Sequence, residues 1–256
     1  MEIHLIKIIR SLRDYSRGKR VASCLNACLS KSVLNQIKML DFYSQFIAKG
    51  DLCFDVGANF GNRTKVFLGL GAKVVCIEPQ QVCLRKLRRL FGNNKNITIV
   101  NKALGDYEGC GEIDICEAEP TISTMSDKWK YDGRFSKNYK WEKKQQIIVT
   151  TLDSLIALYG LPKFCKIDVE GFEKSVLRGL TVPIPFISFE FTKEFFDDSK
   201  KCISHLLSIA PAEFNCSIGE SMELLFPDWV TPERLYDKLE SSEEKLLWGD
   251  VYVKFT

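Results

Sequence analysis

The chain has 256 residues, with 36 Lys and Arg against 33 Asp and Glu, which gives a formal net charge of +3. Its 45% hydrophobic and 27% charged residues exclude a disordered or fibrous protein, and its length predicts one large α/β domain with a modest appendage. No apolar run reaches the roughly 18 to 20 residues of a membrane helix, and the first residues lack the apolar block of a signal peptide, so we expect a cytoplasmic protein.

The ten cysteines are scattered along the chain and do not form the dense pattern of a secreted disulfide scaffold. Several of them, such as Cys53, Cys76 and Cys165, lie in apolar runs typical of strands, which favours reduced, buried thiols. No pair has CxxC spacing, and the sequence has only two histidines, so no metal site built from Cys and His is expected.

Residues 1–47 are expected to form a basic, helical N-terminal extension. The first helix presents apolar side chains at Leu5, Ile8 and Leu12 with basic residues between them, so it could contact an anionic membrane surface. Packing of this apolar face on the domain is the favoured alternative. A second helix is predicted at about 32–48, before Gly50 interrupts the pattern.

From residue 51 the pattern is strand, glycine turn, helix, strand. Strands are predicted at 52–56 and 73–77, with a turn through Gly57 and Gly61 and a helix up to about residue 70 between them. The remaining predicted strands are 97–100, 111–116, 146–150, 163–167, 185–190, 213–217 and 249–255, and the remaining helices are 80–91, 151–158, 172–180 and 198–209. This alternation predicts a mostly parallel sheet with helices on both faces and ligands at the carboxyl ends of its strands.

The first turn reads Asp55-x-Gly57-x-Asn59-x-Gly61 and lacks the third glycine of a dinucleotide fingerprint. An acid before the turn repels phosphate but suits an ammonium group. Glu78, at the end of the next strand, is placed to accept hydrogen bonds from both hydroxyls of a ribose. The two features together indicate a nucleoside that carries an amino acid, and a purely structural glycine turn is the alternative.

A second group of acids follows in "FCKIDVEGFEKSVLRGL". If the strand geometry persists, Asp168 and Glu170 project on one side, and two nearby carboxylates can raise one another's pKa to suit a general base. Alternatively, Glu170 only favours the N-terminus of the next helix, and Asp168 orients water or a cofactor. Glu190 in "FISFEF" is a third acid on the same rim, with either a catalytic or a supporting role.

These segments resemble the FkbM family of S-adenosylmethionine-dependent methyltransferases. The resemblance is carried, in the family's order, by "FDVGANFGNRT", "VVCIEPQ", "NKALGD", "TLDSL", "KIDVEGFEKSVLRGL" and "ISFEF". It implies a Rossmann-like class I methyltransferase fold over residues 48–256, with a seven-stranded, mostly parallel sheet. It also implies O-methylation of a hydroxyl on a sugar, glycan or related natural product, for example in polysaccharide biosynthesis.

The resemblance also assigns residues to the parts of the cofactor S-adenosylmethionine. The methionine moiety would contact Asp55, Gly57, Asn59 and Gly61, the ribose Glu78, the adenine side Asn101, Ala103 and Leu104, and Asp168 would also lie at the cofactor.

The chemistry needs an acceptor oxygen aligned with the sulfonium methyl and a group that removes its proton. Asp168 or Glu170 is the predicted base, with Glu190 beside them and His205 a lesser candidate. Magnesium held by Asp168 and Glu190 is a further alternative, but no full ligand set is visible, so no metal is expected.

Residues 126–144 form a basic and aromatic insertion. Lys128, Trp129, Lys130 and Arg134 are its candidate acceptor-binding residues, and an anionic sugar is favoured over single-stranded RNA as their ligand because the net charge is small. A solvated insertion anchored by its aromatic residues is nearly as well supported. No DNA partner is expected.

Two other functional classes remain open at this point. One is a non-catalytic nucleotide-binding or interaction module on the same fold, and the other is a nicotinamide oxidoreductase. An RNA methyltransferase is a less favoured variant of the main hypothesis.

Overall fold

The structure is a computed structural model and describes residues 31–256. Its centre is a seven-stranded sheet in which β10 runs antiparallel to both of its neighbours and the other neighbouring strands run parallel. In spatial order the strands are β3 (Ile97–Val100), β2 (Lys73–Ile77), β1 (Leu52–Val56), β7 (Phe164–Ile167), β8 (Phe186–Thr192), β10 (Trp248–Phe255) and β9 (Ala212–Ile218). The seven-stranded, mostly parallel sheet predicted from the sequence is confirmed.

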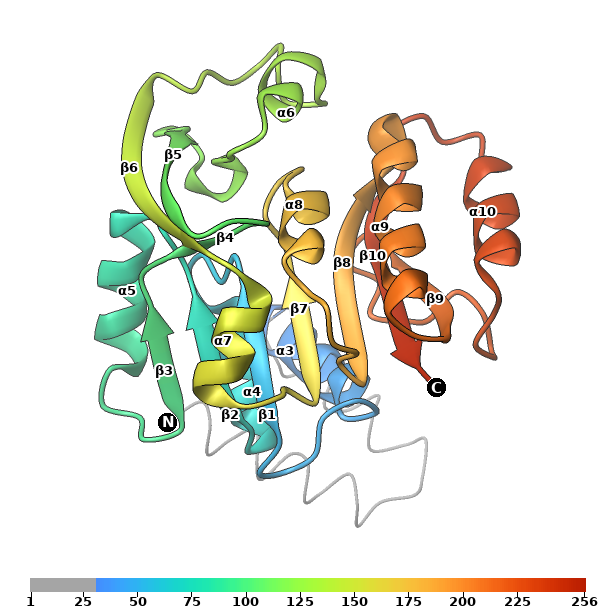
Figure 1. Cartoon of the computed structure of the whole chain (residues 1–256), viewed down its shortest axis with the longest axis horizontal. Helices are drawn as coiled ribbons and strands as arrows, with labels where there is room; N and C mark the ends of the chain where they lie inside the picture. The colour runs from blue at the N-terminus through green and yellow to red at the C-terminus, as the bar shows by residue number, and fades with distance from the viewer. Residues whose placement is uncertain (1–30) are drawn as a thin grey trace.

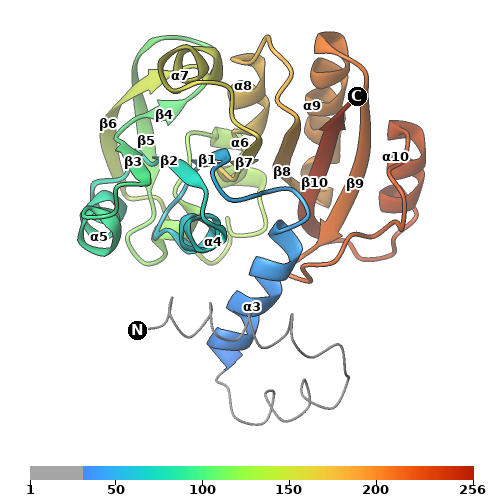
Figure 2. The same cartoon turned by 90° about the horizontal axis from the view of Figure 1, so that it is seen from below.

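Helices cover both faces of this sheet (Figure 2). One face carries α3 (Lys31–Tyr43), α4 (Asn62–Leu70) and α5 (Gln81–Phe91), and the other carries α7 (Leu152–Tyr159), α8 (Glu173–Arg178) and α9 (Phe196–Ile209). The central strands are buried on both sides, which explains their nearly continuous apolar runs. Sequence reasoning missed α10 (Pro232–Glu240), which packs beside β9 and starts with a proline, a residue favoured in the first turn of a helix.

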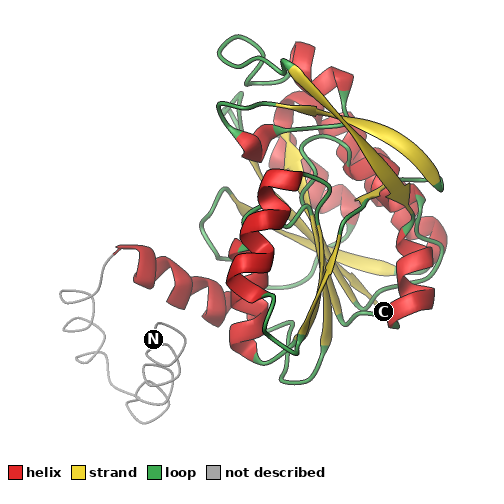
Figure 3. Cartoon of the chain, turned by 90° about the vertical axis from the view of Figure 1, so that its left-hand side faces the viewer, coloured by secondary structure: helices red, strands yellow, loops and turns green. Residues whose placement is uncertain are grey.

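A second, three-stranded sheet stands apart from the large one (Figures 1 and 3). It consists of β4 (Ala103–Leu104), β6 (Lys143–Thr150) and β5 (Gly109–Ile115), in that order, and the connection from β5 to β6 contains α6 (Asp127–Asp132). The predicted strands at 111–116 and 146–150 are therefore confirmed as strands, but they do not belong to the large sheet. They pair with each other and enclose a small apolar cluster of their own.

The N-terminal part of the described chain packs through aromatic side chains. Helix α3 ends at Tyr43, earlier than the predicted boundary near residue 48, because Phe46 turns into a cluster with Phe164 and Tyr252. The predicted first helix lies outside the described residues. Among residues 31–256, no helix is both long and apolar enough to cross a membrane.

The cysteines of the described chain carry free thiols, as predicted, and all of them except Cys110 are buried. Burial raises the pKa of buried thiols such as Cys53 and Cys165. These side chains therefore act as small apolar residues of the core.

Candidate active site

A cavity of about 620 Å³ opens at the carboxyl ends of β1, β2, β7 and β8. The small sheet lies above these strand ends in Figure 1. This volume suits a small-molecule ligand. The residues proposed from the sequence that line it are Asp55, Gly57, Asn59, Glu78, Ala103, Leu104, Trp129, Arg134, Asp168, Glu170 and Glu190.

The turn after β1 fits tightly against the end of β7. Gly57 has a φ of +75°, and a Cβ added there would lie 1.8 Å from the carbonyl oxygen of Asp168. Only glycine can adopt this positive φ and also leave room for the carbonyl oxygen. The turn is also tied to β2, since the backbone N–H of Asn59 donates a hydrogen bond of 2.8 Å to the carboxylate of Glu78.

Glu78 lies at the end of β2 and is only 2% exposed. One of its oxygens accepts a hydrogen bond from Asn59 and the other accepts one of 2.8 Å from the backbone N–H of Gln80. Burial raises the pKa of Glu78 to about 7. A carboxylate offers about four lone-pair positions, so about two remain for the hydroxyls of a ligand.

Gln80 is a cavity residue that the sequence reasoning missed. It follows Glu78 in the "EPQ" segment, and its side-chain NH₂ donates to the carbonyl of Pro120, while its Oε1 is buried without a partner among the described residues. A second acceptor is therefore available next to Glu78.

Asp55 lines the same cavity at the end of β1, and its carboxylate accepts a hydrogen bond from the hydroxyl of Thr64. Burial raises the pKa of Asp55. A ligand ammonium group would stabilise the ionised carboxylate and offset its desolvation.

Two residues assigned to the cofactor do not line the cavity. Gly61 precedes α4 with a φ of +84°, and an added Cβ would meet Phe91 at 2.6 Å and Leu87 at 2.8 Å, so this glycine allows close packing on α5. Asn101 is exposed, and the neighbouring Lys102 lines the cavity instead.

Asp168, Glu170 and Glu190 form an acidic group whose carboxylate oxygens lie within 4.8 Å of one another. The expected proximity is therefore present, but the expected reason is wrong: β7 ends at Ile167, and Glu170 has a φ of +55° in the turn that follows. Burial and the neighbouring acids raise the pKa of Glu170 and of Glu190. Oxygen atoms at this spacing can share protons or hold a divalent cation.

Lys166 is a second cavity residue that the sequence reasoning missed. It is 1% exposed on β7, and its ammonium donates hydrogen bonds to Asp250 at 2.8 Å and to Asp168 at 3.1 Å. Although burial favours the neutral amine, the two carboxylates raise the pKa of Lys166. The sequence signal that could have identified it is a lysine inside an apolar strand.

The helix-terminal role considered for Glu170 belongs to Glu173. Its Oε1 accepts hydrogen bonds from the backbone N–H groups of Val169 at 3.0 Å and Gly171 at 3.4 Å, at the start of α8. Glu170 is thereby left facing the cavity. His205 does not line the cavity, and its Nε2 lies 3.0 Å from the carbonyl oxygen of Leu180.

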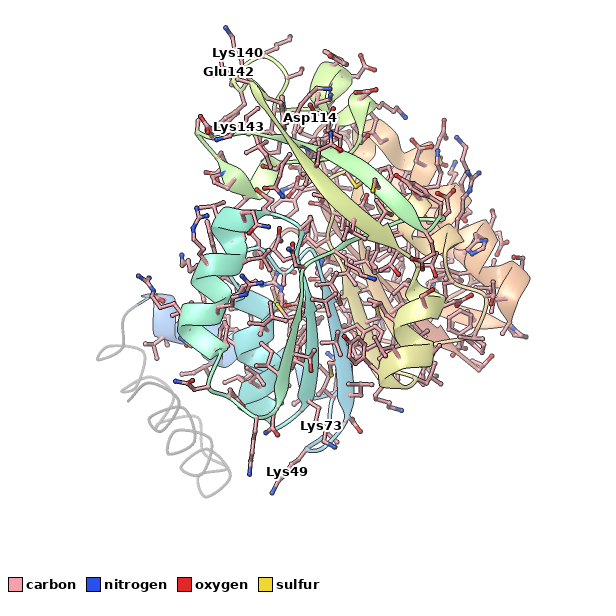
Figure 4. The ribbon with its side chains drawn as sticks, turned by 60° about the vertical axis from the view of Figure 1, so that its left-hand side comes forward. Lys49, Lys73, Asp114, Lys140, Glu142 and Lys143 are labelled. Carbon is pink, nitrogen blue, oxygen red and sulfur yellow. The ribbon has the colours of Figure 1, made fainter. Side chains whose placement is uncertain are left out.

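The cations of the insertion mostly face protein carboxylates. Lys130 pairs with Asp114 at 2.6 Å, and Arg134 makes two hydrogen bonds to Glu194, so these charges are neutralised within the protein. Figure 4 shows Asp114 on the small sheet and Lys143 towards its outer tip. The expectation that Lys130 and Arg134 hold an anionic acceptor is therefore corrected, because carboxylates of the protein already bind both side chains.

Lys128 and Trp129 of the same insertion lie elsewhere. Lys128 bonds to Asp198 of α9 at 2.7 Å, and Trp129 is buried against Gly171, Phe135 and Phe195. The tryptophan thus anchors α6 to the main domain, as the solvated-insertion alternative required, and still lines the cavity.

Comparison with known proteins finds one matching family and several solved structures with a similar fold. Residues 55–213 match the family model of the methyltransferase FkbM domain. No curated protein matches significantly.

Among solved structures, the methyltransferase FkbM of Methylobacillus flagellatus KT is 16% identical, with a TM-score of 0.45 over 87% of this chain and 53% of that one. This chain therefore spans about half of that protein's length. The precorrin-6y C5,15-methyltransferase of Geobacter metallireducens GS-15 is 8% identical, with a TM-score of 0.46 and coverages of 86% and 88%. Aeropyrum pernix fibrillarin, with bound S-adenosyl-L-methionine, is 10% identical, with a TM-score of 0.39 and coverages of 81% and 68%.

Proposed function

Because the chain belongs to the FkbM methyltransferase family, we propose that it transfers the methyl group of S-adenosylmethionine to a hydroxyl oxygen of a sugar, glycan or related natural product. The observation that carries this proposal is a single cavity with two chemically different ends. One end has acceptors for an amino-acid nucleoside, and the other has three carboxylates beside the place where an acceptor would enter. Such an enzyme would serve polysaccharide or natural-product biosynthesis.

The cofactor end accounts for each part of S-adenosylmethionine. Asp55 would face the ammonium group of the methionine moiety, and Glu78 would accept hydrogen bonds from the ribose hydroxyls. Ala103, Leu104 and Ile113 contribute an apolar wall against which the adenine would lie.

In the reaction, the acceptor oxygen attacks the methyl carbon as the bond from carbon to sulfur breaks. The products are the methyl ether and S-adenosylhomocysteine, and the hydroxyl proton passes to a carboxylate. Asp168 or Glu170 receives it: Asp168 is oriented by the hydrogen bond of 3.1 Å from the ammonium of Lys166, and burial and the neighbouring acids raise the pKa of Glu170, which strengthens it as a proton acceptor. Alignment of the three reacting atoms supplies much of the remaining acceleration.

The test combines binding with turnover. Calorimetry should show binding of S-adenosylmethionine and S-adenosylhomocysteine, but not of NAD, and radiolabelled methyl groups should pass to sugar hydroxyls in an acceptor panel. Binding of NAD in place of S-adenosylmethionine would favour an oxidoreductase. Binding without transfer to any sugar or RNA would favour a non-catalytic module.

A further inference from the structure

A second cavity of about 320 Å³ adjoins the first, between α6, α8 and the start of α9. The two cavities share Trp129, Phe172 and Glu190 among their lining residues. The second cavity therefore begins at the acidic group where the proton of the acceptor would be removed. Its volume lies at the lower end of the range for small-molecule sites.

Three lysines converge on the carboxylate of Asp198: Lys128 and Lys174 line this cavity, and Lys201 lies beside it. The ammonium groups of Lys128, Lys174 and Lys201 lie 2.7, 3.2 and 3.0 Å from the carboxylate of Asp198. They come from α6, α8 and α9, so the fold gathers them from distant parts of the chain. Although partial burial acts in the opposite direction, these ammonium groups hold the pKa of Asp198 well below its usual range.

One carboxylate neutralises one ammonium group, so this cluster has two positive charges in excess. The side chains of Lys128, Lys174 and Lys201 are 49%, 36% and 60% exposed, which leaves them accessible to a ligand. Asp127 on the same rim shares the ammonium of Lys130 with Asp114, and its side chain is 83% exposed, so solvent screens its charge. Glu173 and Glu190 also line the cavity, and burial raises the pKa of both carboxyl groups, which disfavours their charged forms. The cluster therefore attracts an anion.

The wall of the cavity is aromatic. Phe172 and Phe195 line it together with Trp129, and the ammonium of Lys128 lies 4.5 Å from the centre of the Phe195 ring. Aromatic rings pack on the apolar face of a sugar ring, while ammonium groups hold a phosphate, sulfate or carboxylate. An anionic sugar satisfies both features, whereas an inorganic anion would leave the aromatic wall without a partner.

We propose that the second cavity is an acceptor subsite that binds a sugar unit with an anionic substituent, held by Lys128 and Lys174 of its lining and by Lys201 beside Asp198. This inference rests on the proposed function, because it places the sugar beside the methyl-transfer centre. It replaces the expected partners Lys130 and Arg134 with Lys174 and Lys201, neither of which the sequence pattern had singled out.

The test compares three probes by calorimetry in the presence of S-adenosylhomocysteine: glucose 1-phosphate, methyl α-glucoside and inorganic phosphate. Glucose 1-phosphate should bind at least about tenfold more tightly than either of the others, as charge-assisted hydrogen bonds and ring packing both require. High salt should reduce its advantage over the neutral glucoside because the ion contacts are screened. Equal binding of the two sugars, no binding of the sugar phosphate, or equal binding of inorganic phosphate would overturn the proposal.

Variants locate the site. The triple change Lys128→Gln, Lys174→Gln and Lys201→Gln should abolish the preference for the phosphorylated sugar, and Lys174→Gln alone should weaken it severalfold if the triple variant does not fold. The matched control is Lys200→Gln, since Lys200 neighbours Lys201 on α9 but pairs with Glu240. An unchanged preference in the lysine variants, or an equal loss in the control, would refute the assignment.

Binding of S-adenosylhomocysteine, measured separately in the same proteins, distinguishes the two proposals. If S-adenosylhomocysteine does not bind but the lysine-dependent preference for the sugar phosphate is present, the proposed function is refuted and the anionic-sugar site is retained. Its presence without any sugar-phosphate preference would refute only the subsite.

Discussion

Cofactor affinity should depend on pH through Glu78. Its pKa is raised to about 7 by burial, and two of its roughly four lone-pair positions are occupied by the N–H groups of Asn59 and Gln80. In the proposed complex, the remaining positions accept hydrogen bonds from the ribose hydroxyls most strongly while the carboxylate is ionised. Bound cofactor therefore lowers this pKa, so affinity is fully present above about pH 7 and falls towards tenfold per pH unit below it.

The assay is calorimetric titration with S-adenosylhomocysteine between about pH 5.5 and 7.5, below the titration of the ligand's own amino group. Glu78→Gln serves as the control variant because the amide cannot ionise. It should bind about 10- to 150-fold more weakly at pH 7.5, the equivalent of one lost hydrogen bond to a charged group, and its affinity should vary less with pH than that of the wild type, because only Asp55 still titrates at the cofactor. A flat wild-type profile, or the same slope in the variant, would refute the reasoning.

Four further outcomes are expected. Gly57→Ala should lower the free energy of unfolding by about 1–3 kcal/mol in denaturant titrations, because the added Cβ would lie 1.8 Å from a carbonyl oxygen, and unchanged stability would contradict that contact. Asp168→Asn and Glu170→Gln should keep cofactor affinity within a few-fold while at least one lowers turnover by about 10² or more, and normal turnover in both would place the base elsewhere. Arg134→Ala should cost about 1–3 kcal/mol of stability, measured in the same way, because it leaves the carboxylate of Glu194 without its bidentate partner. Turnover should survive EDTA, since the ammonium bonded to Asp168 opposes a divalent cation at the acidic group, and inhibition reversed by magnesium would show the opposite.

The parts of the fold that were predicted correctly depend on short stretches of chain. The turn around Gly57 and the acid Glu78 belong to one βαβ unit, in which residue type and spacing already determine the arrangement. The apolar runs of the buried strands gave their positions to within a few residues. These features needed no knowledge of distant contacts.

The parts that were not predicted depend on residues far apart in the sequence. Lys166 meets Asp250 across 84 residues, and Lys128 meets Asp198 across 70. A charge pattern cannot show which carboxylate neutralises which cation. The basic residues of the insertion therefore suggested an anion-binding surface, although most of them pair with carboxylates of the protein. The turn at Glu170 escaped prediction for another reason: a positive φ at a glutamate is rare and has no local sequence signature.

The position of β10 has a consequence for the order in which the protein folds. This strand follows β9 in the chain but lies between β8 and β9, so those two strands have no common edge until β10 inserts. The same strand supplies Asp250, the nearer of the two carboxylates that receive the buried ammonium of Lys166. During synthesis, the cavity beside Lys166 therefore acquires its final charge balance only after β10 has left the ribosome, and a nascent chain that stops before β10 has an incomplete sheet as well as a buried ammonium without its nearer carboxylate.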